Sequence, residues 1–186
     1  MRKIIFRNMV SLDGFFEGPN HEIDWHMVND EFNELSIDME KTTDTLIFGR
    51  ITYELMASYW PTELALTDDP KVARMMNTLT KVVFSRTLKH VDWQNSRLVN
   101  GDTVEEITRL KQLPGKDMAI FGSANLAKTL IENNLIDEYQ IFVNPVVLGG
   151  GRSLFEGIKT KLTFNLQGTK IFKNGLVLLT YQPDWK

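Results

Sequence analysis

One pattern occurs twice in this sequence and constrains the fold more than any other feature. An apolar run typical of a buried strand ends at a glycine, and apolar residues at helical spacing follow. The first copy is Thr45–Phe48, Gly49 and Ile51–Tyr59, and the second is Met118–Phe121, Gly122 and a helix striped by Leu126, Ala127, Leu130 and Ile131. Strands that alternate with helices in this way are typical of a parallel sheet covered on both faces.

The rest of the chain continues the alternation. Further strands are expected at Lys3–Val10, Lys81–Ser85, Ser96–Asn100 and Tyr139–Val143. A further helix is expected from the N-cap Asn29 through Lys41. Another should begin at Asp69-Pro70 and bury Val72, Ala73, Met75, Met76 and Leu79. A third should begin at Asp102, because Glu105 follows three residues later as in a capping box. We therefore predict a three-layer α/β domain with a mixed, mostly parallel sheet over residues 1–186.

The C-terminal segment carries a different signal. Two extended runs, Leu162–Phe172 and Leu176–Tyr181, are joined through Asn174-Gly175. An Asn-Gly step between such runs predicts an antiparallel hairpin. Its exposed edge could pair with another chain, which makes a homodimer plausible and leaves open an interaction module with no catalytic activity.

Composition excludes several classes of function. The net charge of −3 provides no positive field for nucleic acid or an anionic membrane, and the absence of cysteine excludes disulfides and thiolate chemistry. The three histidines match no metal-ligand spacing, so we expect no metal site. The N-terminus lacks a signal peptide pattern, and no apolar run approaches the roughly 20 residues that span a bilayer. A cytoplasmic location is expected.

Three local features favour a bound anion. Both strand–glycine–helix junctions leave unpaired N–H groups at a helix start, with Arg50 and Thr52 at the first and Ser123 at the second. Ser85-Arg86 adds a hydroxyl and a guanidinium at a strand end. Each feature alone is equally consistent with an ordinary junction or a solvated arginine. Together they favour a dinucleotide with an extra phosphate, which is NADPH.

The motifs also resemble those of a known family. In chain order they are S-L-D-G at 11–14, I-F-G-R-I-T-Y-E at 47–54, V-V-F-S-R-T-L at 82–88, I-F-G-S at 120–123 and N-P-V-V-L-G-G-G at 144–151. This series resembles the dihydrofolate-reductase fold. It is most similar to the stand-alone relatives of the C-terminal reductase domain of the bacterial riboflavin-biosynthesis deaminase/reductase. The resemblance implies a sheet of about eight strands and NADPH-dependent hydride transfer to a small pteridine-like or ribosylamino-pyrimidine-like heterocycle.

The resemblance also implies roles for particular residues. The nucleotide would be held by Gly49, Arg50, Ile51 and Thr52 on one side and by Phe121, Gly122, Ser123, Ala124 and Leu126 on the other, with Ser85 and Arg86 at the 2′-phosphate and Val10 and Ser11 at the nicotinamide. The substrate would lie near Asp13, Phe15, Trp25, Gly149, Gly150 and Gly151. Asp13 is the candidate for proton relay or substrate orientation.

Alternatives remain for the substrate residues. Asp13 could cap a turn in S-L-D-G, Trp25 could be core packing, and Gly149–Gly151 could be a tight turn. The chain also departs from dihydrofolate reductases in two respects. Gly122-Ser123 replaces a Gly-Gly pair; a serine is tolerated at this position if its φ is negative, but close approach of the backbone to a phosphate is then less favoured. No acid on the first helix aligns with the pterin-binding carboxylate, which keeps open a non-catalytic protein that only binds a nucleotide or ligand.

Overall fold

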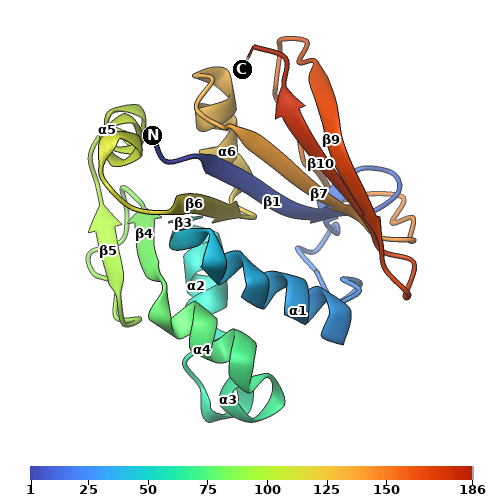
Figure 1. The fold of residues 1–186 in the computed structure, drawn as a ribbon, viewed down its shortest axis with the longest axis horizontal. Coiled ribbons are helices and arrows are strands. Elements are labelled where there is room, and N and C mark those ends of the chain that lie inside the picture. The colour runs from blue at the N-terminus through green and yellow to red at the C-terminus, as the bar shows by residue number, and fades with distance from the viewer. Residues whose placement is uncertain (186) are drawn as a thin grey trace.

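Eight strands form one mixed sheet. The structure is a computed structural model and describes residues 1–185. The strands are β1 (Ile4–Val10), β3 (Thr43–Gly49), β4 (Thr80–Phe84), β5 (Ser96–Val99), β6 (Asp117–Phe121), β7 (Glu138–Val143), β9 (Phe164–Ile171) and β10 (Val177–Pro183). Their order across the sheet is β5-β4-β3-β6-β1-β7-β10-β9, and β10 runs antiparallel to both of its neighbours (Figure 1). The sheet therefore joins strands from nearly the whole length of the chain.

Helices cover both faces of this sheet. They are α1 (Asp30–Asp38), the 3₁₀ helix η1 (Met39–Lys41), α2 (Arg50–Tyr59), α3 (Glu63–Asp68), α4 (Pro70–Thr78), α5 (Thr103–Gln112) and α6 (Ala124–Glu132). Helices α5 and α6 lie on one face, and α1 and α4 lie on the other (Figure 1). The predicted three-layer architecture with a mostly parallel sheet of eight strands is confirmed.

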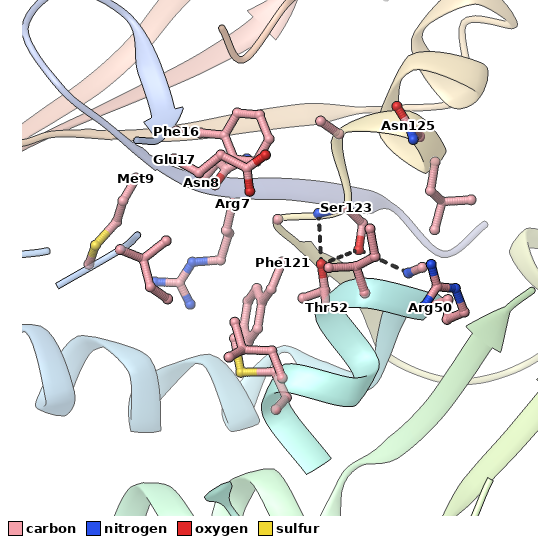
Figure 2. A pocket seen from close by; sticks show the side chains of 18 of the residues that line it. Arg7, Asn8, Met9, Phe16, Glu17, Arg50, Thr52, Phe121, Ser123 and Asn125 are labelled. Carbon is pink, nitrogen blue, oxygen red and sulfur yellow. Dashed lines mark hydrogen bonds between the residues drawn. The ribbon is translucent and has the colours of Figure 1, made fainter. Parts of the chain in front are cut away.

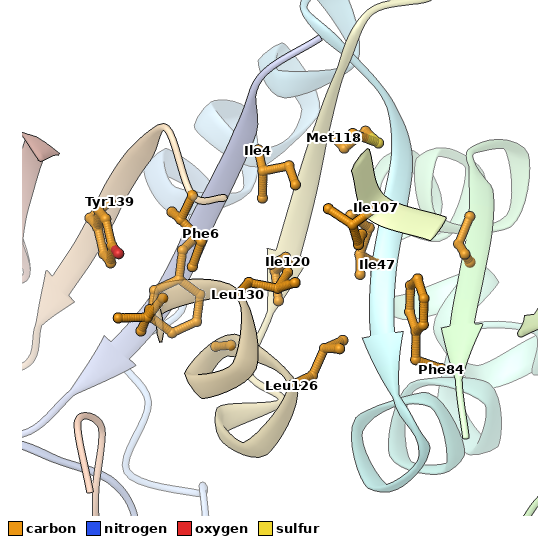
Figure 3. Packing of buried hydrophobic residues seen from close by; sticks show 14 of the residues in the cluster. Ile4, Phe6, Ile47, Phe84, Ile107, Met118, Ile120, Leu126, Leu130 and Tyr139 are labelled. Atoms are coloured by element: carbon orange, nitrogen blue, oxygen red, sulfur yellow. The ribbon is translucent and has the colours of Figure 1, made fainter. Parts of the chain in front are cut away.

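The core is divided by the sheet into an upper and a lower part. Above it, Ile107 of α5 and Leu130 of α6, both fully buried, pack on Phe6 and Ile120 (Figure 3). Below it, α4 supplies Met75 and Met76 to a second cluster. Strands β3, β4 and β6 each contribute buried residues to both clusters, because alternate side chains of a strand point to opposite faces of the sheet. This is why these parallel strands are apolar almost throughout.

The predicted helix starts are found with their caps. The Asn29 side chain accepts a hydrogen bond from the Phe32 amide at 3.0 Å, and the Asp102 side chain accepts one from the Glu105 amide at 2.9 Å. Pro70 is the first residue of α4. Side-chain oxygens at these positions satisfy amides that have no partner inside the helix, so the local sequence determines where each helix begins.

Some elements differ from the sequence-based expectation. The first helix ends at Asp38 and continues as 3₁₀ helix to Lys41, and the short helix α3, capped by Thr62, was not expected. The segment expected to be an irregular loop contains strand β2 (Phe15–Glu17), which pairs with β8 (Arg152–Ser153). No local pattern indicates this pair because its two strands are far apart in the sequence.

The C-terminal hairpin forms as predicted. The Phe172 amide donates to the Leu176 carbonyl at 2.9 Å, and Gly175 takes φ +91°, a value that glycine adopts without strain. Strand β9 is the outermost strand of the sheet, and most of its residues are exposed.

The parallel strands determine where a ligand can bind. Because β4, β3, β6 and β1 are consecutive parallel neighbours, their carboxyl ends lie side by side at one edge of the sheet. Both strand–glycine–helix junctions leave the sheet at this edge, and in open α/β sheets ligands bind there.

Candidate functional site

A cleft of about 1110 Å³ lies along the carboxyl edge of the sheet. Its wall includes residues of β1, the starts of α2 and α6, and parts of α1 and α4 (Figure 2). Eleven of the residues expected to hold a nucleotide line it: Gly49, Arg50, Ile51, Thr52, Ser85, Arg86, Phe121, Gly122, Ser123, Ala124 and Leu126. The structure thus brings three separate sequence motifs to one surface.

The two junctions are hydrogen-bonded to each other. The Ser123 hydroxyl accepts a hydrogen bond from the Gly49 amide at 2.9 Å and lies 2.9 Å from the Thr52 hydroxyl (Figure 2). The Thr52 hydroxyl also accepts from the Ser123 amide at 3.1 Å. We call these three contacts the Ser123 latch. The latch fixes the start of α2 against the start of α6, so two helix N-termini point into one cleft.

The backbone of the second junction is left-handed at two consecutive residues. Gly122 has φ +55° and Ser123 has φ +56°, so the serine does not take the negative φ that would tolerate a Cβ without strain. A Cβ on Gly122 would lie 3.2 Å from the Thr52 hydroxyl oxygen, which explains a glycine there. Serine is held in a conformation that L-residues rarely adopt because its amide and hydroxyl both take part in the latch.

The other polar groups at this end of the cleft are partly engaged. The Arg50 guanidinium pairs with Glu54 at 2.8 Å on the exposed side of α2. The Ser85 hydroxyl accepts hydrogen bonds from the amides of Thr87 and Leu88, at 3.1 and 3.0 Å, and so holds the turn that carries Arg86. These contacts place two guanidinium groups and a row of hydroxyls where phosphate oxygens would need donors.

Two residues expected at the nicotinamide lie behind the cleft surface. Val10 is buried, and Ser11 is 1% exposed with its hydroxyl accepting from the Phe15 amide at 3.0 Å. Neither is among the lining residues. Strand β1 reaches the cleft instead through Arg7, Asn8 and Met9.

Asp13 lies in a loop outside the cleft. Its carboxylate accepts hydrogen bonds from the amides of Leu148 and Gly149, at 3.2 and 2.8 Å. The hydroxyl of Ser11 and these amides lower the Asp13 pKa, so the group is a stable carboxylate at neutral pH. The geometry fits the loop-capping alternative, with the cap made to a distant segment, rather than a proton relay.

The remaining substrate candidates are also placed by local packing. Phe15 and Trp25 are not lining residues, and the Trp25 indole donates to the Glu22 carbonyl at 3.1 Å. Gly149, Gly150 and Gly151 stand outside the lining, and a Cβ on Gly151 would lie 2.2 Å from the Glu17 carbonyl oxygen. This glycine therefore permits the close approach of β8 to β2. The neighbouring Phe16 and Arg152 line the cleft.

Arg7 was missed by sequence reasoning and is the main charged group inside the cleft. Its side chain is 6% exposed, and its guanidinium carbon lies 5.2 Å from the centre of the Phe142 ring and 5.8 Å from that of Phe121. Burial lowers the Arg7 pKa to about 10, against the opposing charge of Glu138, so Arg7 remains cationic at neutral pH. A charged residue within the apolar run Ile4–Val10 was the available signal.

A second polar group faces the cleft near the start of α6. Arg152 lies 5.6 Å from the Phe16 ring centre, contacts the side-chain oxygen of Asn125, and lies 3.7 Å from the Glu17 carboxylate. His26 also lines the cleft, and burial lowers its pKa to about 4, so its imidazole is neutral at pH 7. Arg152 directly follows the glycine motif at 144–151, whereas His26 lies on a segment with no recognisable binding motif.

The described residues contain neither a metal-binding cluster nor a membrane-spanning helix. Within residues 1–185 no group of three or more histidine, aspartate or glutamate side chains could hold a metal ion. The same part of the chain contains no helix long and apolar enough to cross a membrane.

Comparisons with known proteins agree with this geometry. Residues 2–178 match the RibD C-terminal domain family. The uncharacterised YyaP of Bacillus subtilis (strain 168) is 34% identical over 180 residues, which cover 97% of this chain and 94% of YyaP.

Two solved structures are similar as well. A protein from Shewanella sp. PV-4, named for riboflavin biosynthesis, superposes with a TM-score of 0.74 at 25% identity over 99% of both chains. Dihydrofolate reductase from Enterococcus faecalis, complexed with NADP(H), has a TM-score of 0.65 at 18% identity over 98% of this chain and 96% of its own, which shows the shared fold. The chain belongs to the RibD C-terminal domain family and has the dihydrofolate-reductase-like fold.

Proposed function

We propose that the protein is an NADPH-dependent reductase that transfers a hydride to a small heterocyclic substrate. The observation that carries this proposal is the row of strand ends along the cleft. Ser85 and Arg86 follow β4, Gly49 ends β3, Gly122 follows β6, and β1 comes next in the sheet. At roughly 4.8 Å per strand, the row from β4 to β1 is about 14 Å long. An extended dinucleotide fits a row of this length.

The order of chemical groups along the row matches the order along NADPH. Arg86 would meet the 2′-phosphate, and the two latched helix starts would meet the pyrophosphate with amide and hydroxyl donors. The nicotinamide would then lie at β1. When bound, NADPH supplies the hydride, while the protein orients the two reactants and excludes water.

The substrate half of the cleft is apolar apart from a few polar groups. Met9, Val28, Phe32, Leu55, Met56, Tyr59 and Phe142 line it, with Arg7 among them. Leu55 and Tyr59 of α2 are exposed, so this apolar stripe faces the cleft and not the core. Such a pocket suits a flat ring of the pteridine or ribosylamino-pyrimidine kind, with an electron-rich oxygen placed at Arg7.

A second candidate is a nucleotide- or ligand-binding protein without turnover. It is favoured by the surroundings of His26 and Glu17, two lining residues that could otherwise supply a proton. His26 is neutral at pH 7 because of its low pKa, and the Glu17 carboxylate lies 3.1 Å from Nδ1 of His21. Reduction of a C=N bond needs a proton as well as a hydride. In the enzyme that we propose, this proton would come from water.

The expected partners follow from the same reasoning. We propose a small-molecule substrate and no nucleic acid or membrane partner, since the chain has a net charge of −3. We also propose a homodimer in the cytoplasm, formed where the unpaired edge of β9 or the adjoining hairpin meets a second copy.

Thermal shift with NADPH and NADH tests the cofactor assignment. NADPH at about 100 times its Kd should stabilise the native state by about 2.7 kcal/mol. Arg86→Ala should reduce the shift with NADPH and leave that with NADH unchanged. Arg97→Ala is the matched control, because Arg97 pairs with Glu106 at 2.6 Å outside the cleft and should affect neither. If neither nucleotide raises the melting temperature of the wild type, the cofactor assignment is wrong.

Turnover distinguishes the two candidate functions. NADPH oxidation, followed by absorbance, should be detected with at least one member of a panel of pterins, dihydrofolate and aminopyrimidines. Binding of NADPH without oxidation across the panel would instead support the non-catalytic protein.

A further inference from the structure

Asn8 is a buried polar residue with an unused hydrogen-bond donor. The pairing of β1 with β6 ends at Arg7, which lies opposite Phe121, and Asn8 is the next residue of β1. Its side chain is 8% exposed and lines the cleft close to Phe16 and Glu17 (Figure 2). Its side-chain nitrogen is buried and has no hydrogen-bond partner among residues 1–185.

An unpaired buried donor of this kind needs a physical explanation. Folded proteins pair nearly all such groups, because an amide that leaves water without a partner loses its hydrogen bonds. Phe6 and Val10, the neighbours of Asn8 on the same side of β1, are apolar and pack in the core. An apolar residue would therefore suit position 8 if packing were its only role. An asparagine that opens onto a cleft suits a ligand that carries an acceptor.

The direction of the side chain selects one half of the cleft. Successive residues of a strand point to opposite faces, so Asn8 and Arg7 face different sides of β1. Arg7 points toward Phe121 and Phe142 in the substrate half. Asn8 lies on the side of α6, where Phe6 and Val10 pack against Leu126 and Leu130. The ligand that meets Asn8 is thus the one held at the start of α6.

We propose that the Asn8 side-chain amide donates a hydrogen bond to the carboxamide oxygen of the nicotinamide ring. This inference rests on the proposed NADPH function, because the row of phosphate-binding strand ends leads from β4 to β1 and places the nicotinamide end of the dinucleotide beside Asn8. A primary carboxamide pairs well with another one, since each offers a donor and an acceptor. Asn8 would fix the rotation of the ring, and with it the face of the ring presented to the half that contains Arg7.

Asn8→Leu tests this assignment, because leucine has nearly the same shape and no donor. Dissociation constants would be measured by calorimetry for NADPH and for 2′-phospho-ADP-ribose, which has the same phosphates but lacks the nicotinamide. We expect NADPH to bind about 3- to 10-fold more weakly to the variant, the factor that one neutral hydrogen bond provides. The affinity for 2′-phospho-ADP-ribose should be unchanged. The melting temperature without ligand should be unchanged or higher, since an unpaired buried donor is removed.

Three outcomes would overturn the proposal. Equal NADPH affinity for wild type and variant would show that Asn8 makes no such contact. Equal weakening of both ligands would show that the substitution only disturbs the cleft. Binding of neither ligand to the wild type would refute the NADPH function as well, which separates that failure from the other two. Asn8→Val, which suits a strand, gives the same comparison if the leucine variant does not fold.

Discussion

The left-handed serine at the second junction leads to an unusual order of stabilities for two substitutions. Ser123→Ala and Ser123→Gly both remove the hydroxyl that accepts from the Gly49 amide and contacts Thr52. Loss of the acceptor leaves a partly buried amide without its partner, which costs about 1–3 kcal/mol in either variant. Only glycine relieves the backbone, because φ +56° costs a residue with a Cβ about 1 kcal/mol.

Ser123→Gly should therefore be more stable than Ser123→Ala by about 1 kcal/mol, which corresponds to roughly 2–4 °C in melting temperature for a chain of this size. Urea denaturation followed by tryptophan fluorescence measures this difference. Ser58, an exposed residue within α2, is the matched control. There the alanine variant should be the more stable by about 1 kcal/mol, since glycine is a poor helix former. An alanine variant at 123 as stable as the glycine variant would refute the left-handed latch.

Two further substitutions test the buried cations. Arg7→Met should raise the free energy of unfolding by about 0.5–2 kcal/mol, because it removes a desolvated charge. The same substitution should lower kcat/KM for any substrate identified in the NADPH oxidation assay. Lower stability with unchanged turnover would contradict the role of Arg7. Lys81 is fully buried, donates to the carbonyls of Met76 and Asn77 at 2.8 and 3.1 Å, and has its pKa lowered by burial from 10.5 to about 8. The unfolded chain therefore binds more protons than the folded one between about pH 8 and 10.5. The stability of the wild type should rise with pH across this window relative to that of Lys81→Met. Urea midpoints that change with pH in the same way in both proteins would show that the Lys81 pKa is not lowered.

Local sequence patterns were sufficient for most of the fold and for the phosphate end of the cleft. Gly49 and Gly122 each mark a junction where a strand ends and a helix begins. Both junctions could be predicted because the strand, the glycine and the helix are adjacent in the sequence. The hairpin at Gly175 is equally local. Parallel strands then place the two junctions together without any further information, because their carboxyl ends share one edge of the sheet.

Long-range contacts decided what the sequence left open. Asp13 was assigned either to a turn cap or to catalysis, and amides of Leu148 and Gly149 occupy its carboxylate. The segment that carries them lies beside the S-L-D-G loop because β1 pairs with β7, with Val10 opposite Val143, and because the Leu12 amide donates to the Val146 carbonyl at 2.8 Å. No local pattern predicts these contacts. Arg7 and Asn8 were overlooked because the apolar pattern of β1 was interpreted only as a core strand.

Calorimetric titration of the wild type with NADPH and with NADH tests the central claim most directly. We predict that NADPH binds at one site per chain and about tenfold or more tightly than NADH. This ratio corresponds to roughly 1.4 kcal/mol from the charged contact of Arg86 with the 2′-phosphate. The absence of binding, or equal affinity for the two nucleotides, would contradict the assignment of the cleft as an NADPH site.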